Sequence, residues 1–400
     1  MRRLLPALLA VLAVTATVAA GVPAAPATGT DTTAAPIVTL QNTTNFLAFP
    51  DGAVETRRFG NASLGVTSAT AMDAGRFDDR LVVASLERRL ERAPNDTART
   101  QAVEAAVADL RANIGALERR QARAIQRYNA GSLSIGAFLH EMAIVDARAR
   151  SISTTIDGVL TTAARQPGYS LPISLRTDIE SLRATPSVYR GPIRQRLGRA
   201  VTGDLERVSV YAETSANGVV LARASDSRYV REAFLGSQHD PDGRNQIDIT
   251  TAYERVRTLY PWADRNRVTV PSARGYGDAA IYRINIDHSH GRLIAFIDGA
   301  TTEVFREIQE KRLAVLPHET SVVRGANLTL RVNRTHESGP MSVAVSETDG
   351  GDPVDARVTV DGQFVGRTGA DGRLWTIQPT GSARVNVTAA AGRTVDLTLG

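Results

Sequence analysis

The feature that most constrains the fold is a pair of apolar seams at helical spacing, one on each side of a short break. The first seam consists of Val103, Val107, Leu110, Ile114 and Leu117. The second consists of Ile135, Phe138, Met142, Val145, Ala149, Ile152, Ile156 and Val159. Between them, Asn129-Ala-Gly-Ser132 interrupts the pattern. Seams of about four heptads joined by a short turn predict a long antiparallel helical hairpin. The hairpin could present a partner-binding face or form a self-packed stalk.

A second region, from Val208 onward, changes from helical to alternating apolar spacing. Two strand pairs surround turn signals there: 208–214 with 219–224 around Ala216-Asn217-Gly218, and 281–286 with 293–297 around His288-Ser-His-Gly291. Each pair precedes a stretch that the pattern assigns to a helix, Tyr229-Val-Arg-Glu232 and Val304-Phe-Arg-Glu307. An amphipathic helix is expected over 248–260. We therefore expect a β-β-α unit used twice, giving a four-stranded antiparallel sheet with helices on one face.

From Glu319 the helical patterns stop, and short alternating strands separated by Gly, Asp and Pro predict a β-sandwich. The expected fold class is multidomain α+β. The expected parts are a signal peptide (1–20), a flexible leader with short strands (21–73), a helical hairpin domain (74–204), an α+β domain (205–315) and an immunoglobulin-like sandwich (319–400).

The chain begins as a secretory signal would. Arg2 and Arg3 precede an apolar stretch that ends in the small-residue motif Val18-x-Ala20, which predicts export and cleavage. An uncleaved membrane anchor is the alternative, because the apolar stretch is close to spanning length. No later stretch approaches that length, so we expect no membrane span in the mature chain. The expected location is extracellular, either free or held at the cell surface by partners.

Composition agrees with an exported protein and narrows its chemistry. The absence of cysteine excludes disulfides, thiolate metal sites and cysteine nucleophiles. The 47 cations and 42 anions are interleaved without basic runs, so we expect no nucleic-acid binding. Six sequons are candidate N-glycosylation sites, although Asn is also a common turn residue. They begin at Asn42, Asn61, Asn95, Asn327, Asn333 and Asn386.

Two segments resemble known extracytoplasmic modules. Residues 355–373, with a strand, an Asp-Gly turn and then Gly-Arg-Thr-Gly-Ala-Asp-Gly, resemble carboxypeptidase-regulatory-like modules of the immunoglobulin type. Such modules are accessory parts of surface proteins and carry no catalytic residues. Residues 282–287, 291–298 and 302–304 are similar to PepSY-type modules, with Thr302 where the pattern has Gly. That resemblance implies the binding or inhibition of a peptidase.

The overall layout resembles that of a haloarchaeal-type family of secreted proteins. The residues that carry this resemblance are Tyr128-Asn-x-Gly131, Tyr169-Ser-Leu-Pro172, Tyr211-x-Glu-Thr214, Tyr260-Pro-Trp262 and Val332-Asn-Arg-Thr335. It implies a location and an order of domains, but no activity.

Three local groups are candidate chemical sites. His288 and His290 could share a metal, or they could be solvated turn residues. Asp240, Asp242, Asn245 and Asp248 crowd one Gly-containing loop that could hold Ca²⁺ or be a polar turn. Tyr260 and Trp262 could line a groove, but we expect them to fill a core. No hydrolase, metalloprotease or phosphate-loop motif is present, so we expect no catalytic, cofactor-binding or metal-binding residues and no enzyme activity.

The sequence thus favours a non-catalytic extracellular interaction or structural protein with a protein or peptide partner. The alternatives are a PepSY-like modulator of a peptidase, and a hydrolase using the loop near Asp240. We expect a ligand, if any, to add to an open sheet edge at 208–214 or 282–286, unless other domains cover it. The oligomeric state stays open.

Overall fold

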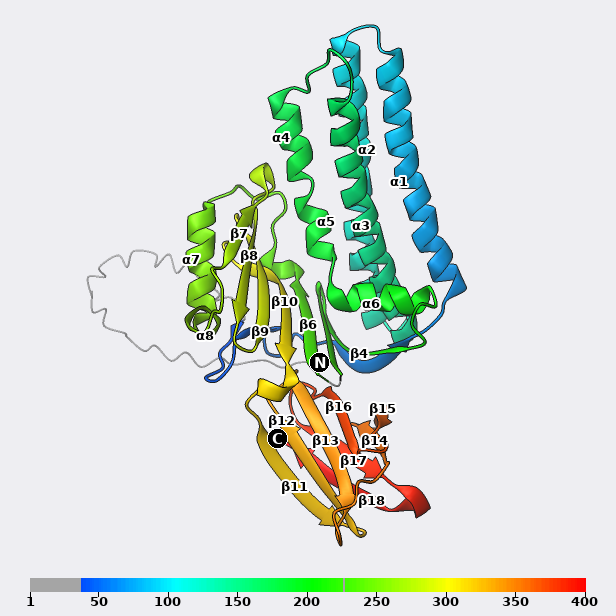
Figure 1. Cartoon of the computed structure of the whole chain (residues 1–400), viewed down its shortest axis with the longest axis vertical. Helices are drawn as coiled ribbons and strands as arrows, with labels where there is room; N and C mark the ends of the chain where they lie inside the picture. The colour runs from blue at the N-terminus through cyan, green and yellow to red at the C-terminus, as the bar shows by residue number, and fades with distance from the viewer. Residues whose placement is uncertain (1–36, 226) are drawn as a thin grey trace, which may run out of the picture. The chain divides into compact units, whose positions relative to one another are not determined.

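The two apolar seams form neighbouring helices in the computed structural model, which describes residues 37–225 and 227–400 (Figure 1). The helices are α1 (Val66–Arg92), α2 (Asp96–Asn129) and α3 (Ile135–Ala164). Asn95 caps α2 by accepting a hydrogen bond from the Ala98 N–H at 2.9 Å, and Ser134 caps α3 in the same way. The predicted antiparallel hairpin of α2 and α3 is confirmed.

The hairpin is larger than expected, because α1 also packs along α3. Gly158 permits this close approach, because a Cβ there would lie 2.8 Å from a Val83 methyl carbon. Three shorter helices follow: α4 (Ile173–Ser181), α5 (Ala184–Tyr189) and α6 (Pro192–Val201).

The alternating region forms one eight-stranded antiparallel sheet in the order β3-β4-β5-β6-β10-β9-β8-β7. Its strands are β3 (Thr56–Ala62), β4 (Val208–Ser215), β5 (Gly218–Ser225), β6 (Arg228–Leu235), β7 (Ser272–Gly275), β8 (Ile281–His288), β9 (Gly291–Asp298) and β10 (Val304–Arg312). Strands β1 (Ile37–Val38) and β2 (Phe46–Leu47) pair with each other. The short 3₁₀ turns are η1 (Gly236–Gln238), η2 (Gly277–Ala279), η3 (Leu313–Val315) and η4 (Ala390–Gly392).

The β-β-α detail of the expected fold is wrong, although the α+β class is confirmed. The segments around Tyr229 and Val304 are strands β6 and β10, which pair with each other at the middle of the sheet. Both faces of these strands are covered, so polar residues such as Glu232 and Glu307 are buried beside apolar ones. A strand buried on both faces loses the alternating pattern by which strands are recognised.

Helices cover both faces of the sheet, not one face as expected (Figure 1). The core formed with α1–α6 includes Val210, Phe234 and Phe296. The opposite face packs on α7 (Ile249–Leu259) and α8 (Pro261–Arg265) through residues such as Ile284 and Ile297. The predicted helix over 248–260 is thus confirmed, with Asp248 as its N-cap.

The C-terminal β-sandwich is confirmed as two four-stranded sheets. One contains β11 (Glu319–Gly325), β12 (Leu328–Arg334), β13 (Pro340–Glu347) and β16 (Arg373–Ile377). The other contains β15 (Gln363–Arg367), β14 (Arg357–Val360), β17 (Ala383–Thr388) and β18 (Thr394–Leu399). Asp361 and Gly362, both at positive φ (49° and 74°), turn the chain between β14 and β15. The sandwich has its own apolar core.

A smaller apolar cluster joins the sandwich to the large sheet. Tyr211 and Tyr229 of the sheet meet Ile377 of the sandwich. The Tyr229 hydroxyl donates to the Ser338 carbonyl at 2.9 Å, and the Thr380 hydroxyl donates to the buried Glu213 carboxylate at 2.6 Å.

The structure describes only part of the N-terminal segment for which we made predictions. The signal peptide (1–20) and the first part of the leader lie outside the described residues. The later part of the 21–73 segment, where short strands were expected, supplies β3 to the large sheet and the first turns of α1. Of the helices in the described part of the chain, none has the length and apolarity needed to cross a membrane.

Candidate functional site

Two adjoining hollows lie where α3, α5 and α6 face the sheet. Their volumes are about 420 and 360 Å³, and both are lined by Ser187, Arg190 and Tyr276. The sheet contributes residues from β10, β9 and β8 to the first hollow and Arg274 of β7 to the second. We call the combined hollow the arginine cleft, defined by Arg150, Arg183, Arg190, Arg274 and Arg283.

The sheet beneath the arginine cleft carries a row of side chains across four paired strands. In register, Arg306 of β10 lies opposite Phe296 of β9, Phe296 lies opposite Arg283 of β8, and Arg283 lies opposite Arg274 of β7. Directly opposed residues of antiparallel strands share one face of the sheet. Arg274 and Arg283 are therefore like charges in direct cross-strand contact range, an arrangement that destabilises a sheet unless an anion screens it.

Arg190 enters the cleft from the segment that joins α5 to α6, and buried groups fix its backbone. Its carbonyl oxygen accepts a hydrogen bond from Arg306 Nη2 at 3.0 Å. The next N–H, that of Gly191, donates to Asp146 Oδ1 at 2.9 Å. Only glycine fits at 191, because a Cβ there would lie 2.2 Å from a Glu232 carboxylate oxygen. The Arg190 side chain thus extends from a rigid support.

Three of the cleft's arginines lack an anionic partner among the described side chains. Arg150 pairs with Asp146 at 2.7 Å and Arg183 with Asp157 at 2.5 Å. For Arg190, Arg274 and Arg283, by contrast, no described carboxylate lies within ion-pair distance.

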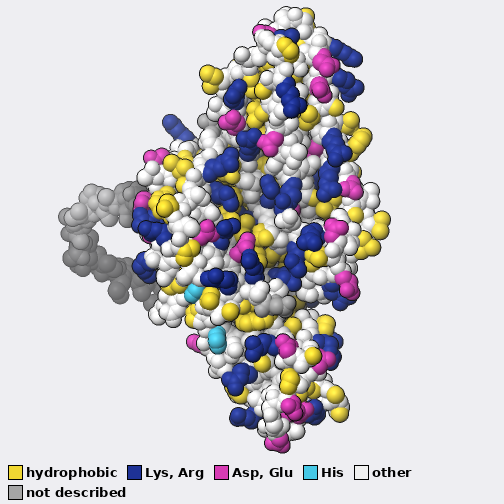
Figure 2. All heavy atoms as spheres, viewed as in Figure 1, with side chains coloured by type: hydrophobic (Ala, Val, Ile, Leu, Met, Phe, Trp, Pro, Cys, Tyr) yellow, Lys and Arg dark blue, Asp and Glu magenta, His cyan; other side chains and the backbone are white. Residues whose placement is uncertain are grey.

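The surroundings of these arginines favour an anion. Burial, followed by the positive charge of Arg150, lowers the pKa of Arg190. Arg274 is oriented by stacking over the Tyr276 ring at 5.0 Å. In Figure 2, basic side chains predominate over acidic ones on the face that carries α5 and the neighbouring part of the sheet. The cleft can therefore bind a carboxylate, phosphate or sulfate group through charge-assisted hydrogen bonds.

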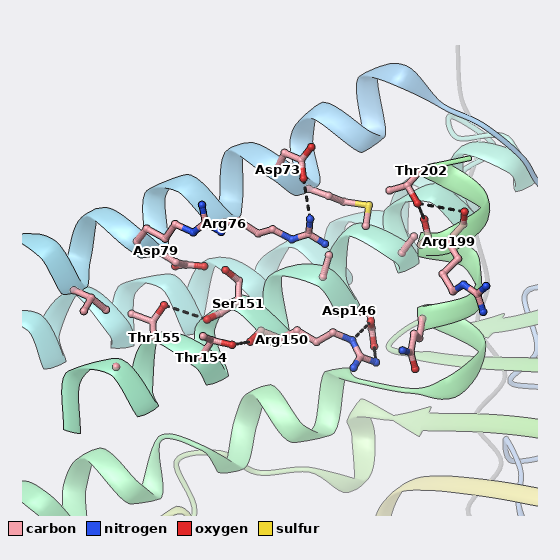
Figure 3. Close-up of a pocket in the computed structure, with 18 of the residues that line it drawn as sticks. Asp73, Arg76, Asp79, Asp146, Arg150, Ser151, Thr154, Thr155, Arg199 and Thr202 are labelled. Atoms are coloured by element: carbon pink, nitrogen blue, oxygen red, sulfur yellow. Dashed lines mark hydrogen bonds and ion pairs between the residues drawn. The ribbon is translucent and has the colours of Figure 1, made fainter. Parts of the chain in front are cut away.

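A larger groove of about 910 Å³ lies between α1, α3 and α6 (Figure 3). Its charges largely neutralise one another, because Asp73 pairs with Arg76 at 2.9 Å and Asp146 pairs with Arg150. Asp79 is buried beside Ser151 with one carboxylate oxygen unbonded, and burial raises its pKa. With mixed charges along its length, this groove has no preference for a ligand of one sign.

Beneath the arginine cleft, two carboxylates hold buried arginines on opposite faces of the sheet. Glu232 accepts hydrogen bonds from Arg306 (3.1 Å) and from the Ile193 N–H (2.5 Å) at the start of α6. Glu307 accepts from Arg231 (3.2 Å) and from the Tyr260 hydroxyl (2.6 Å). Buried charges of this kind need their partners, so this network is structural.

The two histidines considered as metal ligands lie against an aromatic ring. His288 is the last residue of β8 and is only 2% exposed, so the expectation of a solvated turn residue is wrong for it. Trp262 contacts the rings of His288 and His290 at centroid distances of 5.5 and 4.4 Å. Burial, with the charge of Lys311, lowers the pKa of His288 to about 3. Within the described ranges, no three His, Asp or Glu side chains are grouped as a metal site requires.

The aromatic pair at the end of α7 divides between two environments. Tyr260 is fully buried against Glu307, so the expectation of a core residue is confirmed for it. Trp262 covers the two histidines instead.

The side chains of the acidic loop that could hold Ca²⁺ make hydrogen bonds to different parts of the chain. Asp248 caps α7, and Asn245 donates to the Tyr282 hydroxyl at 2.8 Å. Asp240 bonds the N–H of Asp242 within the turn. Next to this loop, His239 Nδ1 lies 2.6 Å from Asp298 Oδ2, while its ring stacks on Phe305.

Sequence reasoning missed the arginine cleft because its residues come from three separate segments. The sequence carried no distinct signal: Arg283 takes a regular polar position in the alternation of Tyr282-Arg-Ile-Asn-Ile-Asp287, as a residue on a solvated face would. Arg190 and Arg274 lie in a helix connection and a short edge strand, where an arginine needs no special explanation.

Comparison with known families divides the chain into three consecutive parts. Residues 1–206, just over half of the chain, match a domain of unknown function, DUF7096. The chain belongs to the DUF7096 family. Residues 210–317 match a family of unknown function, DUF7094, and residues 319–396 match an archaeal fibronectin-III type-like domain. No curated protein and no solved structure matches the chain significantly.

These matches refine the resemblances drawn from the sequence. The C-terminal sandwich of the immunoglobulin type is confirmed as a fibronectin-III type-like domain of archaeal type. The middle region matches DUF7094. The matches meet near residues 206–210 and 317–319.

Proposed function

We propose that this DUF7096 protein is a non-catalytic interaction protein of the cell exterior that binds an anionic partner through the arginine cleft. The observation that carries the proposal is the convergence of Arg190, Arg274 and Arg283 in one open cleft, where Asp157 pairs with Arg183 and no described carboxylate is ion-paired with these three. The fibronectin-III type-like domain is compatible with an extracellular interaction role. Arginine in a partly buried cleft recognises carboxylate, phosphate or sulfate groups more selectively than an exposed cation does.

The test compares two double variants that change the net charge equally. Arg190→Gln with Arg283→Gln removes two cleft cations, whereas Arg324→Gln with Arg331→Gln removes two exposed cations from the sandwich. Calorimetry measures the affinity for polyglutamate at low and at physiological salt. We expect the affinity to fall at least roughly tenfold in the cleft variant only. Equal binding by both variants, or no binding by the parent, would refute the proposal.

A hydrolase is the alternative to a non-catalytic role, and the His239–Asp298 pair is its candidate site. A hydrolase would add a nucleophile to such a pair. In the described ranges, no serine or threonine hydroxyl is hydrogen-bonded to the His239 ring, which supports a structural role. A broad screen of ester, peptide and glycoside substrates tests this. Turnover by the parent that His239→Ala abolishes would make the protein an enzyme.

A PepSY-like modulator of a peptidase is the second candidate. It is supported by the turn after β9, where the Asp298 carboxylate accepts hydrogen bonds from the N–H groups of Ala300 (2.7 Å) and Thr301 (3.0 Å). Thr302 there has φ of 61°, the left-handed conformation that glycine adopts easily in the PepSY pattern. An assay of extracellular peptidases with and without the protein tests it. Unchanged peptidase rates at saturating protein would exclude it.

The cell-exterior location rests on the N-terminal pattern and on the sequons. Asn42, Asn61, Asn95 and Asn327 are exposed, as glycosylation requires. The intact mass of the native protein should show cleavage near Ala20 and added glycan. A mass that retains Met1 to Arg3 would favour the membrane anchor instead.

A further inference from the structure

Among the described residues, nothing covers one edge of the large sheet, and this edge lies beside the arginine cleft. Strand β7 is the last strand of the sheet, and all four of its residues are exposed. The opposite edge, β3, is approached by the sandwich, since the Phe59 N–H donates to Gln363 Oε1 at 3.0 Å. The edges expected from the sequence, 208–214 and 282–286, are interior strands and cannot accept another chain.

The hydrogen-bond pattern of β7 identifies which backbone groups are free. The Tyr276 N–H donates to the Ile281 carbonyl, so residues 276 and 281 form a hydrogen-bonded pair. Such pairs alternate along antiparallel strands, which makes Arg274 and Arg283 the next one. The N–H and C=O groups of Ala273 and Gly275 therefore point away from β8, toward the open edge.

The side chains beside this edge favour an acidic occupant. Arg274 points to the same face as Arg283, and that face forms the arginine cleft. A strand added to β7 would place every second side chain on this face, directly beyond Arg274. Carboxylates at those alternate positions would lie beside Arg274 and offset its repulsion with Arg283, since neither guanidinium group has an anionic partner among the described side chains.

We infer that an extended acidic segment of a partner protein adds to β7 as a ninth strand, with alternate carboxylates in the arginine cleft. The inference rests on the proposed function and specifies its ligand class. Backbone hydrogen bonds from Ala273 and Gly275 supply affinity that is independent of sequence, and the arginines supply selectivity for acidic side chains. A recognised segment should therefore alternate Asp or Glu with other residues, and strand-forming residues are expected between them.

The experiment uses an octapeptide of alternating glutamate and threonine, and a control peptide with four glutamates followed by four threonines. Ala273→Pro removes one outward N–H without breaking a bond to β8, which an edge strand tolerates. Ala273→Gly is the matched control, because it keeps that N–H. We expect the parent and Ala273→Gly to prefer the alternating peptide, and Ala273→Pro to bind it roughly tenfold more weakly.

Amide hydrogen exchange provides the second readout, and it separates the two proposals. On addition of the alternating peptide, the amides of Ala273 and Gly275 should gain protection, while that of Arg274 is already protected in the free protein. If Ala273→Pro binds as the parent does, but Arg283→Gln binds weakly, the cleft binds anions and strand addition is wrong. If an eight-nucleotide thymidine oligomer binds more tightly than the peptide, the acidic-segment occupant is wrong. If the parent binds neither peptide nor oligomer, the proposed function itself fails.

Discussion

Lys311 is the only lysine of the chain, and its buried position in β10 predicts an unusual pH dependence of stability. It is 2% exposed, and its Nζ has no hydrogen-bond partner among the described residues. Burial lowers its pKa from 10.5 to about 7, against the attraction of Glu307 and with the repulsion of Arg231. A shift of this size corresponds to roughly 5 kcal/mol of unfavourable free energy for the charged form.

The direction of the effect follows from proton binding. Below pH 7 the amine is protonated in both the folded and the unfolded chain, so it adds no pH dependence. Between pH 7 and 10.5 the unfolded chain keeps a proton that the folded chain has lost, so the free energy of unfolding rises with pH. Above pH 10 the unfolded chain loses tyrosine protons that buried residues such as Tyr229, whose pKa is raised by burial, retain in the folded state. The useful window is therefore pH 7 to about 9.5, over which we expect a gain of about 3 kcal/mol.

The perturbation is Lys311→Met, which keeps the length of the side chain and removes its charge. The variant should be more stable than the parent at pH 6, and the two should converge toward pH 9.5. Urea unfolding at a series of pH values measures this difference. In the parent, ¹³C NMR of the single lysine side chain gives its pKa directly. A lysine pKa near 10.5, or parallel pH profiles for parent and variant, would refute the reasoning.

Three further outcomes test the fold. Ile152→Asp places a charge in the helical core, where the side chain is 2% exposed, and should cost about 4 kcal/mol of unfolding free energy, whereas Ile173→Asp (83% exposed) should cost less than about 0.5. Glu232→Gln leaves two buried arginines without their anion and should cost about 3–5 kcal/mol in urea unfolding; a loss no larger than that of the exposed Glu319→Gln would contradict the network. The fragment 319–400 has its own core and should give a dispersed amide NMR spectrum, while a collapsed spectrum would show that it depends on the large sheet.

The apolar spacing within each segment was enough to predict the helices that pack through one apolar face. The seam from Val103 to Leu117 lies inside α2, and the seam from Ile135 to Val159 lies inside α3. The sandwich was also predictable, because its strands alternate and its turns carry Gly and Asp at positive φ. In these regions the pattern of burial repeats with the period of the element, which is the condition under which sequence patterns are informative.

The central strands and the cleft were not predictable for a common reason. In β6 and β10, charged residues such as Arg231 and Glu307 are buried because each finds its partner on a neighbouring strand. From the sequence alone, such residues are predicted to lie on a solvated surface. The arginine cleft likewise depends on the register that sets Arg274 opposite Arg283, and on a helix connection that brings Arg190 above them. Neither property is encoded within a single segment.

Strand β3 has a consequence for the evolution of this combination of domains. It lies within the DUF7096 match, yet it pairs from Thr56 to Ala62 with β4, most of which belongs to the DUF7094 match. The boundary between the two families therefore crosses a single sheet. A gene that kept only the second region would encode a sheet whose β4 edge is bare and prone to aggregation. We therefore expect the DUF7096 and DUF7094 regions to occur together in the same proteins. The fibronectin-III type-like domain, by contrast, can be exchanged at residue 318 without removing a strand from the large sheet.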